Sequence, residues 1–305
     1  MSSLVGVILL VVGLALVIAG AELFFDGLLA TAARWRLSPF VLTVVVSGFE
    51  LENLAAGIAA NLKGLGNAAA GTFFGGTTFL ALGVAGLGAA VAPIRAALPA
   101  AVLLWSASAP LPLLALGSDG DLSRLDGLIL LAWAALAIGG IAYAGRALPG
   151  SETAERTRHP LWRMLGGLTV LSGAGVALGD GLHRVVTHFG ISQSLLGNTA
   201  VAAAVEVEEV SRVAVPTRHG RGDVALGNIF GTIAHFAAFN AGLIALVRPI
   251  HLDSVSLHLH LPTAAASVLI LAALTTWRRG LRRLDGALLL ALYGGYVAAA
   301  ISLST

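Results

Sequence analysis

Two short acidic segments interrupt stretches of the sequence that are otherwise apolar. One lies in the run 40–60 and the other in the run 195–215. Their acidic residues are Glu50, Glu52, Glu206, Glu208 and Glu209. An acidic side chain at the centre of a membrane helix costs about 2.5 to 3.5 kcal/mol, so it persists mainly where it faces a polar interior and has a task. These segments are therefore the first candidates for chemistry.

The spacing of the acidic residues predicts oxygen ligands for a cation. Residues three apart lie on one face of a helix, so Glu50 and Asn53 point together, as do Glu206 and Glu209. Carboxylate and amide oxygens suit a hard cation such as Ca²⁺ or Mn²⁺, and a chain without cysteine offers no thiolate for copper or zinc. The two pairs are the first candidate ligands of a transported cation.

Further candidate ligands depend on the backbone. Glu52 and Glu208 lie about 200° round an ideal helix from the neighbouring glutamates, so they join the site only where the helix unwinds. No proline forces such a break, and the sequence leaves open whether one occurs. Thr232 and His235 complete the candidate set, although His235 is as easily a satisfied buried polar residue as a ligand for an ion or proton.

Crowded carboxylates predict competition between a cation and protons. Two unit charges about 5 Å apart repel by roughly 3 kcal/mol at an effective dielectric constant of 20. Without a cation, some of the carboxylates should bind protons near neutral pH, and an arriving cation should expel them. This competition favours cation/proton antiport. Coupling to Na⁺ needs more neutral oxygen ligands than lie near these glutamates, yet Na⁺/Ca²⁺ exchange stays an alternative.

Composition places these segments in an integral membrane protein. Of the 305 residues, 57% are hydrophobic and only 11% are charged. The net charge of +2 does not indicate a nucleic-acid surface. The expected partners are the lipid bilayer and inorganic cations, without a bound cofactor, and the oligomeric state is not predicted.

Apolar runs of about 20 residues predict about ten transmembrane helices. The runs are 4–33, 38–60, 67–91, 97–117, 123–145, 161–187, 192–215, 222–247, 261–277 and 284–303. The predicted fold class is therefore an all-α integral membrane protein.

The chain also contains an internal duplication. Positions 52 and 208 are 156 residues apart, and the same offset aligns 64–75 with 220–231, where glycine, alanine and phenylalanine recur. We expect a first five-helix repeat at 1–145, a linker at 146–160 and a second repeat at 161–305. Since five is odd, the repeats enter the membrane from opposite sides and are inverted.

Basic residues predict the orientation, because lysine and arginine accumulate on cytoplasmic loops. The following fall on one side of the predicted topology: Arg34, Arg36, Arg95, Arg146, Arg156, Arg158, Arg163, Arg218, Arg221, Arg278, Arg279, Arg282 and Arg283. Only Lys63, Arg124, Arg184 and Arg248 fall on the other. Both termini are therefore expected outside the cytoplasm, in a prokaryotic plasma membrane.

Five motifs carry a family resemblance. They are Gly-Ala-Glu-Leu-Phe-Phe-Asp-Gly at 20–27, Leu-Ser-Pro-Phe-Val at 37–41, Arg-Leu-Asp-Gly at 124–127, Asp-Val-Ala-Leu-Gly-Asn-Ile-Phe-Gly at 223–231, and Arg-Leu-Asp-Gly-Ala-Leu-Leu-Leu-Ala-Leu-Tyr at 283–293. In these segments the chain resembles the calcium/cation antiporter superfamily, which includes Na⁺/Ca²⁺ and Ca²⁺/H⁺ exchangers. The resemblance implies ten helices in inverted repeats, with a cation site between the second, third, seventh and eighth.

The chain departs from that family where the cation is expected to bind. Na⁺/Ca²⁺ exchangers carry Gly-Thr-Ser-x-Pro-Glu in each repeat. The family glutamate corresponds to Asn53 and Glu209, the serine to Glu50 and Glu206, and the proline to Glu52 and Glu208. The polar residue of the third and eighth helices corresponds to Leu80 and Phe236, with His235 beside the latter.

Two other classes of protein are kept as alternatives. A relative with the antiporter fold that does not transport would explain the missing polar residues at positions 80 and 236. An intramembrane enzyme is disfavoured, since the sequence has no paired-histidine metalloprotease motif and no nucleophile elbow. Arg212 follows Glu208 by four residues, a spacing at which it can neutralise that glutamate.

Overall fold

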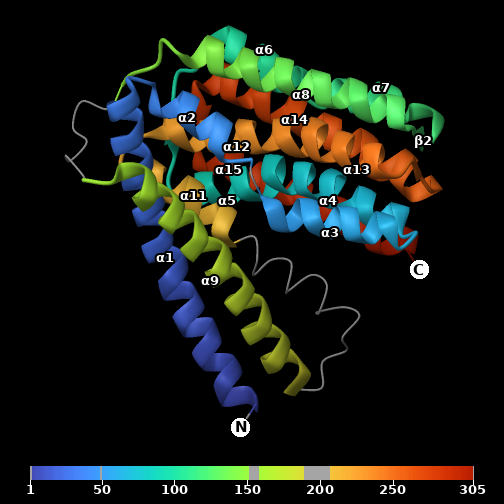
Figure 1. Ribbon diagram of the computed structural model, residues 1–305, viewed down its shortest axis with the longest axis horizontal. Helices are drawn as coiled ribbons and strands as arrows, with labels where there is room; N and C mark the ends of the chain where they lie inside the picture. The colour runs from blue at the N-terminus through green and yellow to red at the C-terminus, as the bar shows by residue number, and fades with distance from the viewer. Residues whose placement is uncertain (1, 49, 151–157, 189–206, 305) are drawn as a thin grey trace. The chain divides into compact units, whose positions relative to one another are not determined.

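The computed structural model describes residues 2–48, 50–150, 158–188 and 207–304. Within these ranges the chain is built from helices, with four two-residue strands at helix ends (Figure 1). Long helices suit a membrane interior because they satisfy every backbone hydrogen bond within one segment. The prediction of an all-α membrane protein is confirmed.

The first half of the chain begins with a long helix and continues through shorter ones. Its helices are α1 (Ser2–Trp35), α2 (Pro39–Val46), α3 (Leu51–Leu62), α4 (Gly66–Thr78), the π-helix η1 (Phe79–Val84), α5 (Ala85–Val91), α6 (Ala100–Ser108), α7 (Leu111–Leu116), the 3₁₀ turn η2 (Gly117–Asp119) and α8 (Arg124–Gly145). Its strands are β1 (Ile94–Arg95) and β2 (Asp121–Leu122).

The second half repeats this order where it is described. Its helices are α9 (Pro160–His188), α11 (Val207–Arg218), α12 (Gly222–Ala234), the π-helix η4 (His235–Asn240), α13 (Ala241–Val247), the π-helix η5 (Ser256–His260), α14 (Leu261–Arg278) and α15 (Arg283–Ser304). Its strands are β3 (Ile250–His251) and β4 (Gly280–Leu281). The π-helices η1 and η4 start 156 residues apart, which is the offset found in the sequence.

Eight helices of the described ranges are long and apolar enough to cross a membrane. They correspond to eight of the ten predicted runs. The run 38–60 is divided between α2 and α3, and the run 192–215 falls partly on residues outside the described ranges. The count of ten helices therefore stays a prediction.

The chain forms two compact units, and each draws on both halves of the sequence. Unit 1 comprises Met1–Pro39 and Gly150–His219, and unit 2 comprises Phe40–Pro149 and Gly220–Thr305. The units differ from the predicted repeats because corresponding helices of the two halves pack against each other. The repeat boundaries themselves stay a prediction.

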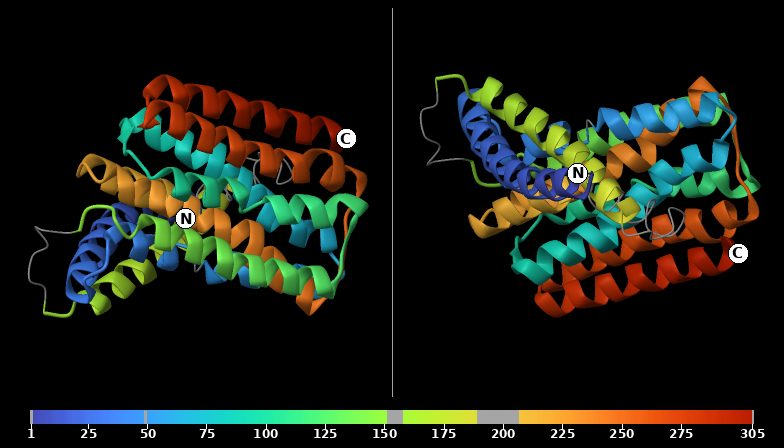
Figure 2. Two further views of the ribbon diagram at one scale, coloured as in Figure 1. Left: turned by 90° about the horizontal axis from the view of Figure 1, so that it is seen from above. Right: turned by 90° about the horizontal axis from the view of Figure 1, so that it is seen from below.

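Unit 1 is built around the pair α1 and α9, which lie side by side along their length (Figures 1 and 2). Glycines let the two backbones approach closely. A Cβ atom on Gly6 would lie 2.9 Å from the carbonyl oxygen of Gly181, and one on Gly27 would collide with the backbone of Met164. Because early residues of α1 meet late residues of α9, the helices are antiparallel. Small residues at such contacts favour helix association in lipid.

In unit 2, contacts between the two halves of the chain occur in matching pairs, as expected for a duplicated sequence. Strand β1 pairs with β4, and β2 pairs with β3, both antiparallel. Likewise Gly86 meets Gly286, and Gly127 meets Gly242. In the duplication, Gly86 corresponds to Gly242 and Gly127 corresponds to Gly286. Replacing each glycine of one contact by its counterpart in the other half therefore gives the other contact. The chain also runs from α4 to α5 in one direction and from α12 to α13 in the opposite one (Figure 1). Both features support inverted repeats.

Candidate functional site

The first acidic segment lies at a break between two helices. Helix α2 ends at Val46 and α3 begins at Leu51, with Glu50 immediately before its first turn. A Cβ atom on Gly48 would overlap the imidazole ring of His235, so only glycine allows the chain to pass there. The break that the sequence left open is present without a proline, and glycine makes room for it.

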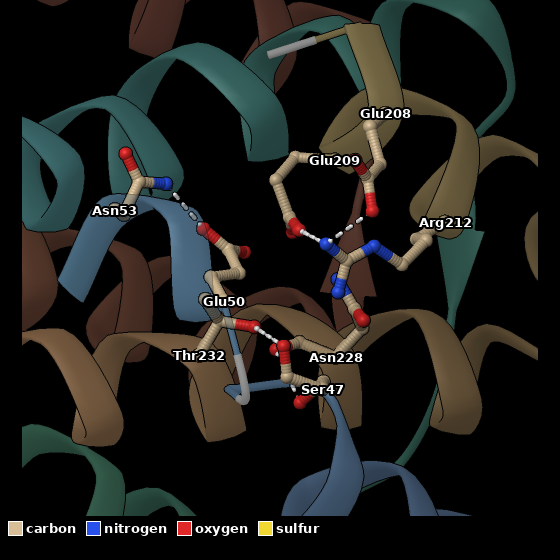
Figure 3. A network of polar contacts seen from close by, with 8 residues as sticks. All are labelled: Ser47, Glu50, Asn53, Glu208, Glu209, Arg212, Asn228 and Thr232. Carbon is tan, nitrogen blue, oxygen red and sulfur yellow. Dashed lines mark hydrogen bonds and ion pairs between the residues drawn. The ribbon is translucent and has the colours of Figure 1, made fainter. Parts of the chain in front are cut away.

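Glu50 and Asn53 point toward each other in unit 2. The Glu50 residue is 7% exposed, and the Asn53 amide Nδ2 donates a hydrogen bond of 2.7 Å to its Oε2 (Figure 3). The two side chains therefore point together, as their spacing predicts, although Glu50 lies immediately before α3 and not within it. A buried carboxylate at the first residues of a helix also benefits from the partial positive charge of the exposed N–H groups there.

Three neighbouring polar residues join the helix break to α12. Ser47 Oγ donates to the Asn228 backbone oxygen at 3.4 Å, and Thr232 Oγ1 donates to the Ser47 backbone oxygen at 3.3 Å (Figure 3). All three residues are buried. The bond from Thr232 occupies a backbone oxygen that the end of α2 would otherwise leave unpaired, and the two bonds together fix the α2 terminus against α12.

His235 lies at the junction between α12 and η4. Its ring is buried and packs against Gly48 and Phe239. Its Nδ1 lies 2.8 Å from the Gly231 backbone oxygen, and since that oxygen can only accept, Nδ1 carries the proton. In the neutral ring Nε2 is then the acceptor, and the ring orientation is set by the helix itself.

The second acidic segment forms a buried ionic cluster in unit 1. Arg212 Nη2 lies 3.0 Å from Glu208 Oε1 and also pairs with Glu209 (Figure 3). The exposed fractions are 3% for Glu208, 2% for Glu209 and 3% for Arg212. The spacing predicted a pair with Glu208 alone. The structure adds Glu209, because both residues lie one turn before Arg212 in α11.

The structure does not describe the side chains of two other predicted ligands. Glu206 lies outside the described residues, and Glu52 belongs to α3 with a side chain that is likewise not described. Leu80 and Phe236 are buried apolar residues at the positions where the family is expected to have polar ones. In the described ranges, no three histidine, aspartate or glutamate side chains gather as a metal site.

Ser47 and Asn228 were missed as site residues. Both are polar residues within apolar stretches, which is the signal that drew attention to the glutamates. Their contacts could not be found from spacing, because 181 residues separate them in the chain.

Comparison with known proteins identifies the family. The sequence profile of the sodium/calcium exchanger protein family matches residues 5–140 and 159–302. The chain belongs to this family. It is therefore an integral membrane protein whose family carries out cation antiport, and it is a transporter rather than an enzyme. The family, the membrane-spanning helices and a relative named as a bacterial inner membrane protein support a location in a bacterial membrane.

Curated relatives and solved structures agree with this assignment. The inner membrane protein YrbG of Escherichia coli strain K12 is 30% identical over 89% of this chain and 88% of its own length. The proposed antiporter CaxA of Alkalimonas amylolytica is 27% identical over 96% of this chain and 98% of its own. The sodium-calcium exchanger NCX_Mj, in crystals soaked with Na⁺ and Sr²⁺, has a TM-score of 0.82 at 22% identity over 97% of this chain and 98% of that one. The last comparison establishes the fold.

Proposed function

We propose that this exchanger-family protein moves a divalent cation, with Ca²⁺ as the first candidate, in exchange for protons by alternating access. The observation that carries the proposal is the carboxylate of Glu50, which is buried at a helix break in a membrane protein. Acidic residues inside membrane proteins typically mark ion or proton pathways, because a carboxylate is costly there unless it has a task. A cation and a proton are the two species that can bind this carboxylate in turn.

The surroundings of Glu50 favour a hard cation. Asn53 contributes an amide beside the carboxylate, while Ser47 and Thr232 contribute hydroxyl groups in the same unit. Oxygen atoms of these kinds are the usual ligands of Ca²⁺. One imidazole, that of His235, and a chain without cysteine do not make a site for softer metals.

The cluster in unit 1 supports a specific alternative. Glu209 stands where the family glutamate is expected, yet its carboxylate pairs with Arg212. A cation that binds Glu209 must displace the guanidinium, which could keep its pair with Glu208. If the guanidinium never leaves, it occupies the place of a cation permanently. This observation favours a relative that keeps the fold without transporting as the second candidate.

Flux into reconstituted vesicles tests the proposal. Vesicles that are acidic inside should take up Ca²⁺, because outward proton flow drives inward cation flow, and a protonophore should abolish the uptake. Mn²⁺, Mg²⁺, Na⁺ and K⁺ provide the comparison ions, and vesicles without protein provide the control. Binding of the cation should weaken as pH falls, since protons compete for the carboxylate. Uptake driven only by a Na⁺ gradient would indicate Na⁺/Ca²⁺ exchange, and absence of all flux would indicate the non-transporting relative.

The distribution of arginines supports a membrane orientation with both termini outside the cytoplasm. A tag at Met1 or Thr305 should be labelled from the non-cytoplasmic side, and one inserted in the linker 146–160 from the cytoplasm. Labelling of intact cells with an impermeant reagent, compared with lysed cells as the control, measures this. Protection of both termini in intact cells would contradict the orientation.

A further inference from the structure

A cavity of about 470 Å³ lies in unit 2 where β1 meets β4. Its lining residues are Pro93, Ile94, Arg95, Arg278, Arg279, Gly280, Leu281 and Arg282. The pairing of Ile94 with Leu281 and of Arg95 with Gly280 brings the ends of α5 and α14 together across a long sequence separation. Four of these eight residues are arginines, and none of the eight is acidic.

A tight turn of the backbone after α14 forms one side of this cavity. Arg279 caps the C-terminus of α14 with a left-handed φ of 53°, and Gly280 follows at a φ of 131°. A Cβ atom on Gly280 would collide with the Ile94 carbonyl oxygen, so the tight turn requires glycine. The turn reverses the chain between α14 and α15 and leaves Arg279 and Arg282 exposed beside Arg95.

The positive charge at the cavity is only slightly compensated. In the part of the chain that the structure describes, the acidic side chain paired with a lining arginine is that of Asp285, which lies 3.6 Å from Arg278 Nε and also accepts a 2.8 Å hydrogen bond from the backbone N–H of Arg282. Four arginines line this one cavity, and their positive charges repel each other unless an anion lies near them. Arginine binds phosphate through two parallel hydrogen bonds, which makes a phosphate the matching anion.

Exposed apolar side chains flank the cavity. Trp277 is 75% exposed and Leu284 is 83% exposed, and they stand at the adjoining ends of the membrane-spanning helices α14 and α15. Tryptophan is typical of the boundary between lipid tails and head groups. A ligand that fits both the arginines and these side chains has a charged phosphate and a hydrocarbon part.

We propose that this cavity binds the phosphate of an anionic phospholipid, with the acyl chains along Trp277 and Leu284. The arginines belong to the side assigned to the cytoplasm by the positive-inside rule, which is the side where anionic lipid attracts basic residues. The site is independent of which ion the protein transports. Through this site, the content of anionic lipid in the membrane would affect the stability of the turn that joins α14 to α15.

The test uses the full chain in detergent and measures bound lipid by native mass spectrometry and thermal stability by melting. Phosphatidylglycerol should bind and raise the melting temperature, whereas phosphatidylcholine and inorganic phosphate should not. In the double variant Arg279→Gln with Arg282→Gln, the affinity for phosphatidylglycerol should fall by about tenfold or more. The double variant Arg146→Gln with Arg158→Gln removes the same charge elsewhere on that side, and its affinity should stay within about twofold of the wild type.

Several outcomes would overturn the proposal. Equal binding of phosphatidylcholine would remove the role of lipid charge, and equal stabilisation by inorganic phosphate would indicate a free anion as the ligand. An equal loss of affinity in both double variants would show general attraction to a basic surface. If the first double variant does not fold, the single variant Arg95→Gln replaces it, with an expected loss of about threefold; unchanged affinity there would likewise exclude the cavity.

Discussion

Replacing Arg212 by glutamine is expected to lower the free energy of unfolding by about 3 to 5 kcal/mol. The change leaves Glu208 and Glu209, which are 3% and 2% exposed, without the guanidinium that pairs with both. Uncompensated charge in a buried place is strongly destabilising, whereas a complete buried pair contributes little net stability. Melting curves and denaturant unfolding of the detergent-solubilised protein measure the loss.

The matched control is Arg184→Gln. Arg184 pairs with Asp180 at 2.9 Å and has the same four-residue spacing, but the two side chains are 43% and 45% exposed. Its loss should cost less than about 1 kcal/mol. Glu209→Gln provides a second comparison, because it leaves a neutral pair of Arg212 and Glu208 and should destabilise far less than loss of the arginine. Equal stabilities of Arg212→Gln and Arg184→Gln would refute the buried cluster.

Replacing Glu50 by glutamine is expected to reduce cation flux by about a hundredfold or more while the protein remains folded. Glutamine keeps the shape and a carbonyl oxygen that can accept the 2.7 Å hydrogen bond from Asn53, so the helix break is preserved. In the proposed exchange, it removes the charge that would attract the cation and the group that would bind the proton. Uptake of Ca²⁺ into acidic vesicles, with melting temperature measured in parallel, checks both parts.

Asp121→Asn is the control for Glu50→Gln. The Asp121 side chain is 66% exposed and pairs with His251 at 2.8 Å where strands β2 and β3 pair. The Asp121→Asn variant loses one carboxylate charge by the same change from acid to amide, and the cation flux through this variant should match that of the wild type. Undiminished flux in the Glu50 variant would exclude that carboxylate as a cation ligand. A loss of flux accompanied by unfolding would mean that Glu50 has a structural role instead.

Several properties of this protein could be predicted from the sequence because they depend on local chemistry. Apolar runs of membrane length predicted the helical membrane fold, and the recurrence of residues 64–75 at 220–231 predicted related halves. The contact between Glu50 and Asn53 followed from their three-residue spacing, since one helical turn brings such residues together. The same rule found the pair of Glu208 and Arg212.

Other properties are decided only by tertiary structure, because they depend on residues that are distant in the sequence. The ring of His235 packs against Gly48 at the helix break, and this contact cannot be predicted from the residues next to Gly48 in the sequence. The division into units reflects the packing of α1 on α9, which crosses the predicted repeats. The arginine cavity exists because β1 pairs with β4. Local spacing fixes which side chains share one turn of a helix, whereas the packing of whole helices decides which turns meet.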